Sequence, residues 1–156
     1  MSKSSFINWE NAPVSKEGFV ALFIFMSGLV GEGFYDGVIF HRIIDGFMIQ
    51  GGDPTGTGTG DPSIPSIKDE FIEGNSNLRG TIAMANRGPD TGSSQFFINL
   101  IDNTNLDFDK QPESSKHPVF GKVVEGMDVV DKIAKVQTGG QDKPIDDVVI
   151  EKATIV

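Results

Sequence analysis

Residues 39–52 read IFHRIIDGFMIQGG, and this stretch decides the fold. Seven of its fourteen side chains are large and apolar, yet Arg42 lies among them. A guanidinium is costly to bury without a partner. Arg42 is therefore either satisfied structurally, or it faces a cleft where its donors are used on something else.

Short apolar runs bounded by Gly, Asp, Asn or Pro continue on both sides of this stretch and predict β-strands. They span residues 38–44, 47–50, 81–85, 95–100, 119–123 and 148–156. One helical period is clear, because Met127, Val130, Ile133 and Ala134 fall on one face. The pair Gly139-Gly140 follows, as a helix stop would. Many short strands and few helices predict a β-barrel or sandwich with helices at its ends.

Strand alternation sorts the run QFFINL, residues 95–100, into two faces. Phe96, Ile98 and Leu100 form a clean core face. The opposite face combines Gln95 and Asn99 with the ring of Phe97. Because a buried amide must find partners, this mixture favours a binding surface over a core.

Two polar tracts predict loops. Residues 53–66, DPTGTGTGDPSIPS, are rich in Gly, Pro, Thr and Ser, and residues 102–118 form a charged surface excursion. The run TGTGTGD lacks the Lys-Ser or Lys-Thr of a phosphate-binding loop, and prolines follow where such a loop would open a helix. We interpret it as a turn-forming loop beside a cleft.

Composition bounds the function. The 156 residues suit one domain, and the net charge of −9 disfavours nucleic acid as a partner. There is no cysteine, which excludes a disulfide scaffold, thiolate catalysis and a cysteine zinc site. The most apolar window, residues 19–30, is too short to cross a bilayer, so no membrane association is expected.

Metal and hydrolase chemistry find little support. His41 and His117 lie far apart, no HExxH or EF-hand pattern is present, and Ser93-Ser94 lie outside any G-x-S-x-G elbow. What remains is a polar and apolar set without an acid, base or nucleophile. Its members are Arg42, Phe47, Met48, Gln50, Asn86, Gln95, Phe97 and His117. Composition and periodicity alone do not raise this set above ordinary core and surface roles.

Three stretches resemble the cyclophilin family of peptidyl-prolyl cis-trans isomerases. They are FHRIIDGFMIQGGDPTGTGTG, RGTIAMANRGPDTGSSQFFINL and HPVFGKVVEGMDVVDKI. They occur in the family's order, and the match runs from about Gly31 to the C-terminus. The combination of FHRxIxGFMxQGGD with GSSQFFI is highly specific. The short, acidic, cysteine-free chain is most similar to single-domain prokaryotic members.

The resemblance implies a closed antiparallel eight-stranded β-barrel capped by two α-helices, formed by residues 1–156 as one domain, with the active groove on the outer wall. Arg42 resembles the catalytic arginine. Ala85 and Asn86 resemble the backbone clamp for the residue before proline, and His117 the histidine at the pocket rim. The other expected substrate-binding residues are Phe47, Met48, Phe97 and Leu106 in the proline pocket, Gln50 and Gln95 as backbone-holding amides, and Gly58 beside the groove.

The implied activity is rotation about Xaa–Pro bonds in peptides and unfolded proteins, in support of protein folding. It requires no cofactor and no metal. The resemblance further favours a cytoplasmic monomer. The alternative is a non-catalytic module that holds proline peptides or a partner protein in the same groove.

Two departures from the family stand out. The position before Leu106, usually aromatic, is Asn105, so cyclosporin-type inhibitors are expected to bind weakly. At the N-terminus, residues 5–19 resemble the second strand and the start of a helix opened by Pro13, with no convincing first strand before them. The piece FVALFIF, residues 19–25, either forms a substitute strand or leaves the barrel incomplete.

Overall fold

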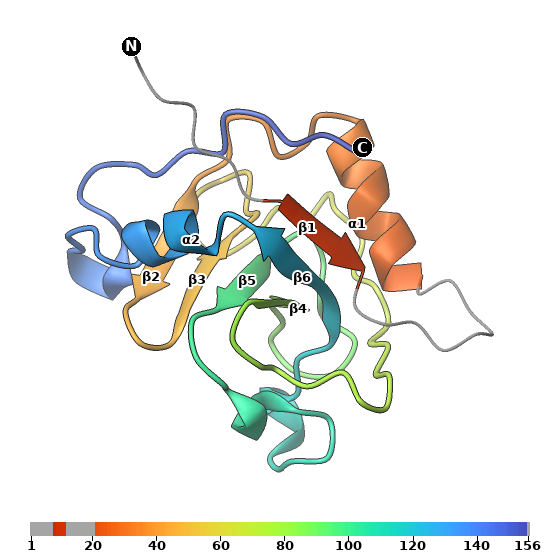
Figure 1. The fold of residues 1–156 in the computed structure, drawn as a ribbon. Coiled ribbons are helices and arrows are strands. Elements are labelled where there is room, and N and C mark those ends of the chain that lie inside the picture. Colours follow the sequence, from red (N-terminus) through yellow and green to blue (C-terminus); the bar gives the residue numbers. More distant parts are fainter. Residues whose placement is uncertain (1–7, 12–20, 156) are drawn as a thin grey trace.

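Six short strands form the main sheet in the computed structural model of the chain, which describes residues 8–11 and 21–155 (Figure 1). They are β1 (Asn8–Asn11), β2 (Phe40–Ile44), β3 (Met48–Gly51), β4 (Thr81–Met84), β5 (Phe96–Asn99) and β6 (Val119–Glu125). The helices are α1 (Ala21–Gly31) and α2 (Met127–Ile133), and the 3-10 turns are η1 (Thr104–Leu106), η2 (Glu113–Ser115) and η3 (Gly140–Asp142).

The sheet is antiparallel throughout, in the order β1-β6-β4-β5-β3-β2. At the β2 edge, the Phe40 amide donates to Val148 O and the Ile150 amide donates to Val38 O, both at 2.9 Å. This pairing is limited to an isolated bridge between Ile39 and Val149, so the strand expected over residues 148–156 does not form. The described strands make an open six-stranded sheet, and the expected closed barrel of eight strands is not confirmed.

The other five predicted strands are confirmed, with ends shifted by one or two residues. The predicted helix is confirmed as α2, which ends at Ile133. Gly139-Gly140 do not cap it, because they lie several residues further on and lead into η3.

The expectation that FVALFIF forms a substitute strand is wrong, because residues from Ala21 onward form α1. Leu22, Met26 and Val30 are spaced by four residues, so they share one helix face, and all three are buried in the core. Asn8–Asn11 pairs with β6 as the expected N-terminal strand. Pro13, the predicted helix opening, lies outside the described residues.

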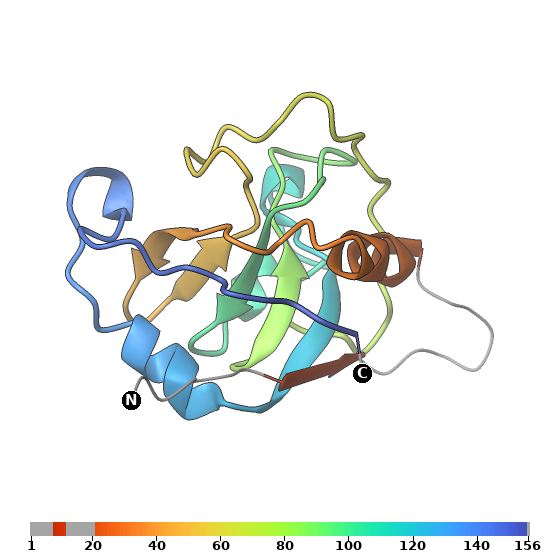
Figure 2. The same cartoon turned by 90° about the horizontal axis from the view of Figure 1, so that it is seen from above.

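One face of the sheet forms the main core. Ile49, Ile82 and Ile98 from neighbouring strands pack with residues of both helices there. Figures 1 and 2 place α1 and α2 at opposite ends of this core. The expected core face of residues 95–100 is confirmed, because Phe96, Ile98 and Leu100 belong to this cluster. The opposite face of the sheet is therefore available for a functional site. None of the helices in the described part of the chain has the length and apolarity that crossing a membrane requires.

Candidate active site

Arg42 belongs to a row of residues that runs across four neighbouring strands. It pairs with Gln50 across β2 and β3, Gln50 pairs with Phe97 of β5, and Phe97 pairs with Ala83 of β4. Directly paired residues project from the same face of a sheet. Arg42 therefore lies on the face of Phe97 and opposite the main core, to which its neighbour Ile43 belongs.

The Arg42 side chain is 44% exposed, and its Nε lies 3.7 Å from Asp142 Oδ2 of η3. This placement resolves the choice raised by the sequence: the guanidinium is at the surface of a cleft and not inside the apolar core. Gln50 Nε2 donates to Gln95 Oε1 at 3.1 Å, and Gln95 Nε2 donates to Gly58 O at 3.2 Å.

Beside this row lies a second, smaller apolar cluster on the same face. It consists of the buried residues Met48, Ala83, Phe97, Leu106 and Val119, with Ile44, Phe47 and Ala85 partly buried against them. We call this set the apolar cluster. Three of the four residues expected in the proline pocket are members, and Phe47 packs at the margin. The cluster provides a water-poor surface next to a charged group.

His117 covers the ring of Phe97. The two rings meet edge to face, with centroids 5.3 Å apart and planes at 84°. His117 Nδ1 is 2.9 Å from the Met84 carbonyl oxygen. Burial lowers the pKa of His117, although the Met84 hydrogen bond and the charge of Asp69 act in the opposite direction. The ring is therefore disposed to be neutral and to donate from Nδ1.

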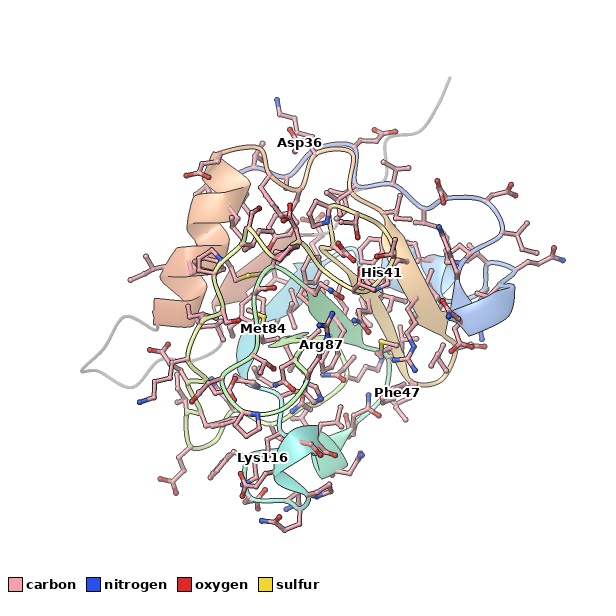
Figure 3. All side chains as sticks on the ribbon, turned by 180° about the vertical axis from the view of Figure 1, so that it is seen from behind. Asp36, His41, Phe47, Met84, Arg87 and Lys116 are labelled. Carbon is pink, nitrogen blue, oxygen red and sulfur yellow. The ribbon has the colours of Figure 1, made fainter. Side chains whose placement is uncertain are left out.

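Asn86 and Ala85 follow β4 along the edge of the apolar cluster. Asn86 Nδ2 donates to Lys116 O at 2.8 Å, which joins this edge to the segment carrying His117. The Ala85 amide donates to Gln95 O at 3.0 Å. Figure 3 shows Lys116, Met84 and Arg87 along this side of the molecule. The structure thus brings the expected clamp residues, the rim histidine and the amide pair around one surface.

Asn99 departs from its sequence interpretation. It is fully buried, and its Nδ2 donates to Asn77 Oδ1 and Thr81 Oγ1 while its Oδ1 accepts from Asn103 Nδ2. A buried amide with these partners holds structure together and offers nothing to a ligand. Asn103 also donates to Phe47 O, so this network fastens η1, with Leu106, against the sheet. Asn105 of η1 is exposed.

The glycine loop after β3 is organised by Asp53. This buried carboxylate accepts from the amides of Thr55, Gly58 and Gly60 and from the Thr55 hydroxyl, at 2.7–3.0 Å. Burial alone would raise the pKa of Asp53, but these hydrogen bonds outweigh it and the pKa is lowered. Gly58 has a φ of +84°, and a Cβ there would lie 3.3 Å from the ring of His41. The loop flanks a cleft, as its composition predicted.

That cleft, of about 910 Å³, has Arg42 in its lining and no member of the apolar cluster. Its lining is His41, Arg42, Gln50, residues 56–59, Arg87, Gln141, Asp142 and Lys143. Sequence reasoning missed Arg87, Asp142 and Lys143 as site residues, because each belongs to a loop with no pattern of its own. Within the described part of the chain, no group of three or more His, Cys, Asp or Glu residues could hold a metal ion.

An always-charged arginine beside an apolar cluster defines a class of site that can bind an apolar ring and stabilise polarity that develops near it. The sequence model of the family "Cyclophilin type peptidyl-prolyl cis-trans isomerase/CLD" matches residues 6–155. This chain belongs to the cyclophilin-type peptidyl-prolyl cis-trans isomerase family.

Individual relatives agree with this assignment. Human peptidyl-prolyl cis-trans isomerase-like 1 is 43% identical over 151 residues, which cover 93% of this chain and 81% of that protein. A Streptococcus pyogenes protein named for both a phosphatase and a peptidyl-prolyl cis-trans isomerase is 47% identical over 150 residues, and the match spans only 32% of its length. The crystal structure of a Cryptosporidium parvum cyclophilin type isomerase, obtained in the presence of the dipeptide Ala-Pro, superimposes with a TM-score of 0.80 at 28% identity, covering 96% of this chain and 92% of that one.

Proposed function

We propose that this chain catalyses cis-trans isomerisation of Xaa–Pro bonds in peptides and unfolded proteins, with Arg42 as the catalytic residue. The observation that carries the proposal is the sheet register. It places Arg42 on the face of the apolar cluster, two strands away from Phe97. A prolyl ring held by the cluster therefore lies on the same sheet face as the guanidinium, and catalysis needs its nitrogen to face Arg42.

The barrier to be lowered is electronic. Amide resonance makes rotation about a peptide bond cost roughly 20 kcal/mol. As the bond twists, resonance is lost, and the prolyl nitrogen becomes pyramidal with a localised lone pair. A donor aimed at that lone pair stabilises the twisted state but not the planar one, so the interaction lowers the barrier. A saving of about 7 kcal/mol would accelerate the rotation on the order of 10⁵-fold.

The surrounding residues have separate roles in this proposal. Met48, Phe97 and Leu106, with Phe47 at the margin, hold the prolyl ring while the carbonyl side rotates. Gln50 and Gln95 are linked to each other and to the glycine loop at Gly58, so their amides are fixed in place for the substrate backbone. Ala85 and Asn86 hold the residue before proline. His117 packs on Phe97 and closes the rim.

Arg42→Ala tests the catalytic assignment. We expect kcat/KM for an Ala-Pro peptide, measured by NMR exchange spectroscopy, to fall about 10²–10³-fold, as for other lost transition-state donors. The matched control is Arg79→Ala. It removes another half-exposed arginine, whose ion pair with Asp131 lies away from the cluster. Unchanged activity in Arg42→Ala would contradict the proposal, as would an equal loss in the control.

A non-catalytic peptide-binding module is the second candidate. The observation in its favour is the contact of Arg42 with Asp142, which neutralises part of the charge that catalysis needs. Peptide binding in a titration, without exchange between cis and trans signals, would support the module. Exchange that disappears with Arg42 would support the enzyme.

The finer architecture belongs to the same proposal. We infer that residues 1–156 form one domain whose sheet closes into the family's eight-stranded barrel. In support, residues 148–150 already extend the β2 edge by hydrogen bonding to residues 38–40. A cytoplasmic location, a monomeric state, weak cyclosporin binding and the absence of a cofactor stay predictions from the sequence.

A further inference from the structure

The cleft beyond Arg42 has a charge that contrasts with the rest of the chain. Arg42, Arg87 and Lys143 line it, and Asp142 is the only carboxylate in its lining. The chain as a whole carries a net charge of −9. Asp53 lies behind the lining, where four hydrogen bonds from the glycine loop hold its carboxylate, and its charge opposes the cations only in part. The cleft is thus a local cationic site on an acidic protein.

The charges of Arg87 and Lys143 are not neutralised within the described part of the chain. Arg87 Nη2 donates to Thr59 O across the mouth of the cleft, and that carbonyl is uncharged. No ion pair of Lys143 occurs among residues 8–11 and 21–155, whereas Arg42 has Asp142. Two cations without carboxylate partners therefore face one volume, built by three segments far apart in sequence.

His41 lies within the field of two of the lining cations, Arg42 and Lys143. It is 6% exposed, lines the cleft, and its Nδ1 has no hydrogen-bond partner among the described groups. Burial lowers the pKa of His41, and the charges of Arg42 and Lys143 lower it further, against the opposing charge of Asp53. Figure 3 shows His41 and Arg87 on the face that carries the cleft. The histidine is disposed to be neutral, so the positive field comes from the arginines and the lysine.

The cleft shares Arg42 and Gln50 with the catalytic surface but none of the apolar cluster. A peptide whose prolyl ring lies on the cluster has room for a further residue on the cleft side of Arg42. Under the proposed function, Ala85 and Asn86 hold the residue before proline, and Arg87 follows them directly in the chain. The preceding part of the substrate therefore extends toward Arg87 and Lys143.

We propose that Arg87 and Lys143 make this isomerase select substrates with an acidic side chain two residues before the proline. The inference rests on the proposed function, because it needs the prolyl bond at Arg42. Each uncompensated cation within several ångströms of a carboxylate contributes modestly at a wet surface, and the two act together. We expect kcat/KM to be about fivefold higher for a peptide with glutamate at that position than for the same peptide with glutamine.

The test compares peptides of the form Ala-Xaa-Ala-Pro-Phe, with Xaa as Glu, Gln or Lys. NMR exchange spectroscopy gives kcat/KM for each without a coupling protease whose own specificity would intervene. The full chain should prefer the three in the order Glu, Gln, Lys. The Glu-to-Gln ratio should shrink as salt is raised, because exposed charges are screened.

Three variants locate the effect. In the double variant Arg87→Gln/Lys143→Gln the Glu-to-Gln ratio should fall to about one. Arg87→Glu should invert the order so that the Lys peptide is preferred. Lys132→Gln removes one positive charge from α2, where the side chain is 78% exposed, and should keep the wild-type ratio.

The outcomes separate this inference from the proposed function. Equal turnover of the Glu and Gln peptides, or a ratio that persists in the double variant, overturns the selection while isomerase activity stands. Turnover of none of the peptides overturns the proposed function itself, and the selection with it. A ratio lost equally in Lys132→Gln would assign the effect to net charge and overturn the role of the cleft.

Discussion

Two regions meet at Arg42, and they are built in different ways. The apolar cluster comes mainly from strands in register, with Phe97, Ala83 and Val119 paired across β5, β4 and β6. Apart from His41, Arg42 and Gln50, the lining of the cationic cleft comes from loops: the glycine loop, the turn after β4 and the segment of η3. The strand-built side provides a rigid and uniformly apolar surface. On the loop-built side, charged residues can be substituted without altering the sheet. We therefore assign ring binding to the first region and substrate preference to the second.

The largest effect should come from the strand-built side. Phe97→Ala removes a buried ring at the centre of the apolar cluster, and the cavity should cost about 3–5 kcal/mol of unfolding free energy. KM for proline peptides should rise as well, because the anchor for the prolyl ring is lost. Urea denaturation and NMR exchange measure the two consequences on the same sample.

Phe108→Ala is the matched control, since this phenylalanine is 38% exposed and, among the described rings, packs only against Phe71. It should cost much less stability and leave KM unchanged. A Phe97→Ala protein as stable as Phe108→Ala would contradict the assignment of the cluster as a second core.

Asn105→Trp should extend the apolar side at its open margin. Asn105 is exposed in η1 next to the buried Leu106, so an indole there can cover the edge of the cluster. We expect affinity for cyclosporin to rise about tenfold, equivalent to about 1.4 kcal/mol. Isothermal titration calorimetry measures it, and Asn105→Phe, which adds a ring without a donor, should gain less. Nanomolar cyclosporin binding by the unmodified chain would refute the expectation.

Asp142→Asn should change the charge of the loop-built side and free Arg42 from its ion pair. Asp142 has a φ of +57°, and asparagine tolerates this left-handed conformation better than most residues. The pair with Arg42 is half exposed, so its loss should alter stability by less than about 1 kcal/mol. Removing the only carboxylate of the cleft lining should raise the Glu-to-Gln ratio about twofold. An unchanged ratio would mean that Asp142 does not oppose the cleft cations, and a large loss of stability would mean that the pair is structural.

The same contrast explains how much the sequence could predict. Alternation along QFFINL identifies the core face. The apolar strand around Arg42 indicates that its guanidinium needs either a polar partner or a cleft. The pairing of Gln50 with Gln95, 45 residues away, cannot be read from either strand alone. The cleft is harder still, because residues 56–59, Arg87 and 141–143 converge only after the loops are placed. The sequence placed Asn99 on a binding surface, whereas it belongs to a buried amide network. The two situations give the same alternation of amide and apolar residues along a strand.

The smallest expected effect is the pH dependence of stability, to which the two histidines, one in each region, should contribute. Burial lowers the pKa of both His117 on the apolar side and His41 in the cleft. An unfolded histidine titrates near 6.5, so the unfolded chain takes up protons first as the pH falls. Stability should therefore be constant above about pH 7 and decline below about 6.5, until the lowered folded-state pKa values are reached.

Urea unfolding midpoints between pH 7.5 and 5.5 test this, in a range above the titration of ordinary carboxylates. His117→Gln and His41→Gln should each flatten part of the decline. Because the chain contains only these two histidines, the double variant provides the baseline for all other groups. A decline that survives in the double variant would contradict the prediction. Asp69 would not account for it, because burial raises its pKa, and a raised carboxyl pKa stabilises the folded state as the pH falls. A decline removed mainly by His41→Gln would show that folding excludes the proton mainly in the cleft, and one removed mainly by His117→Gln would show that it does so at the rim of the apolar cluster.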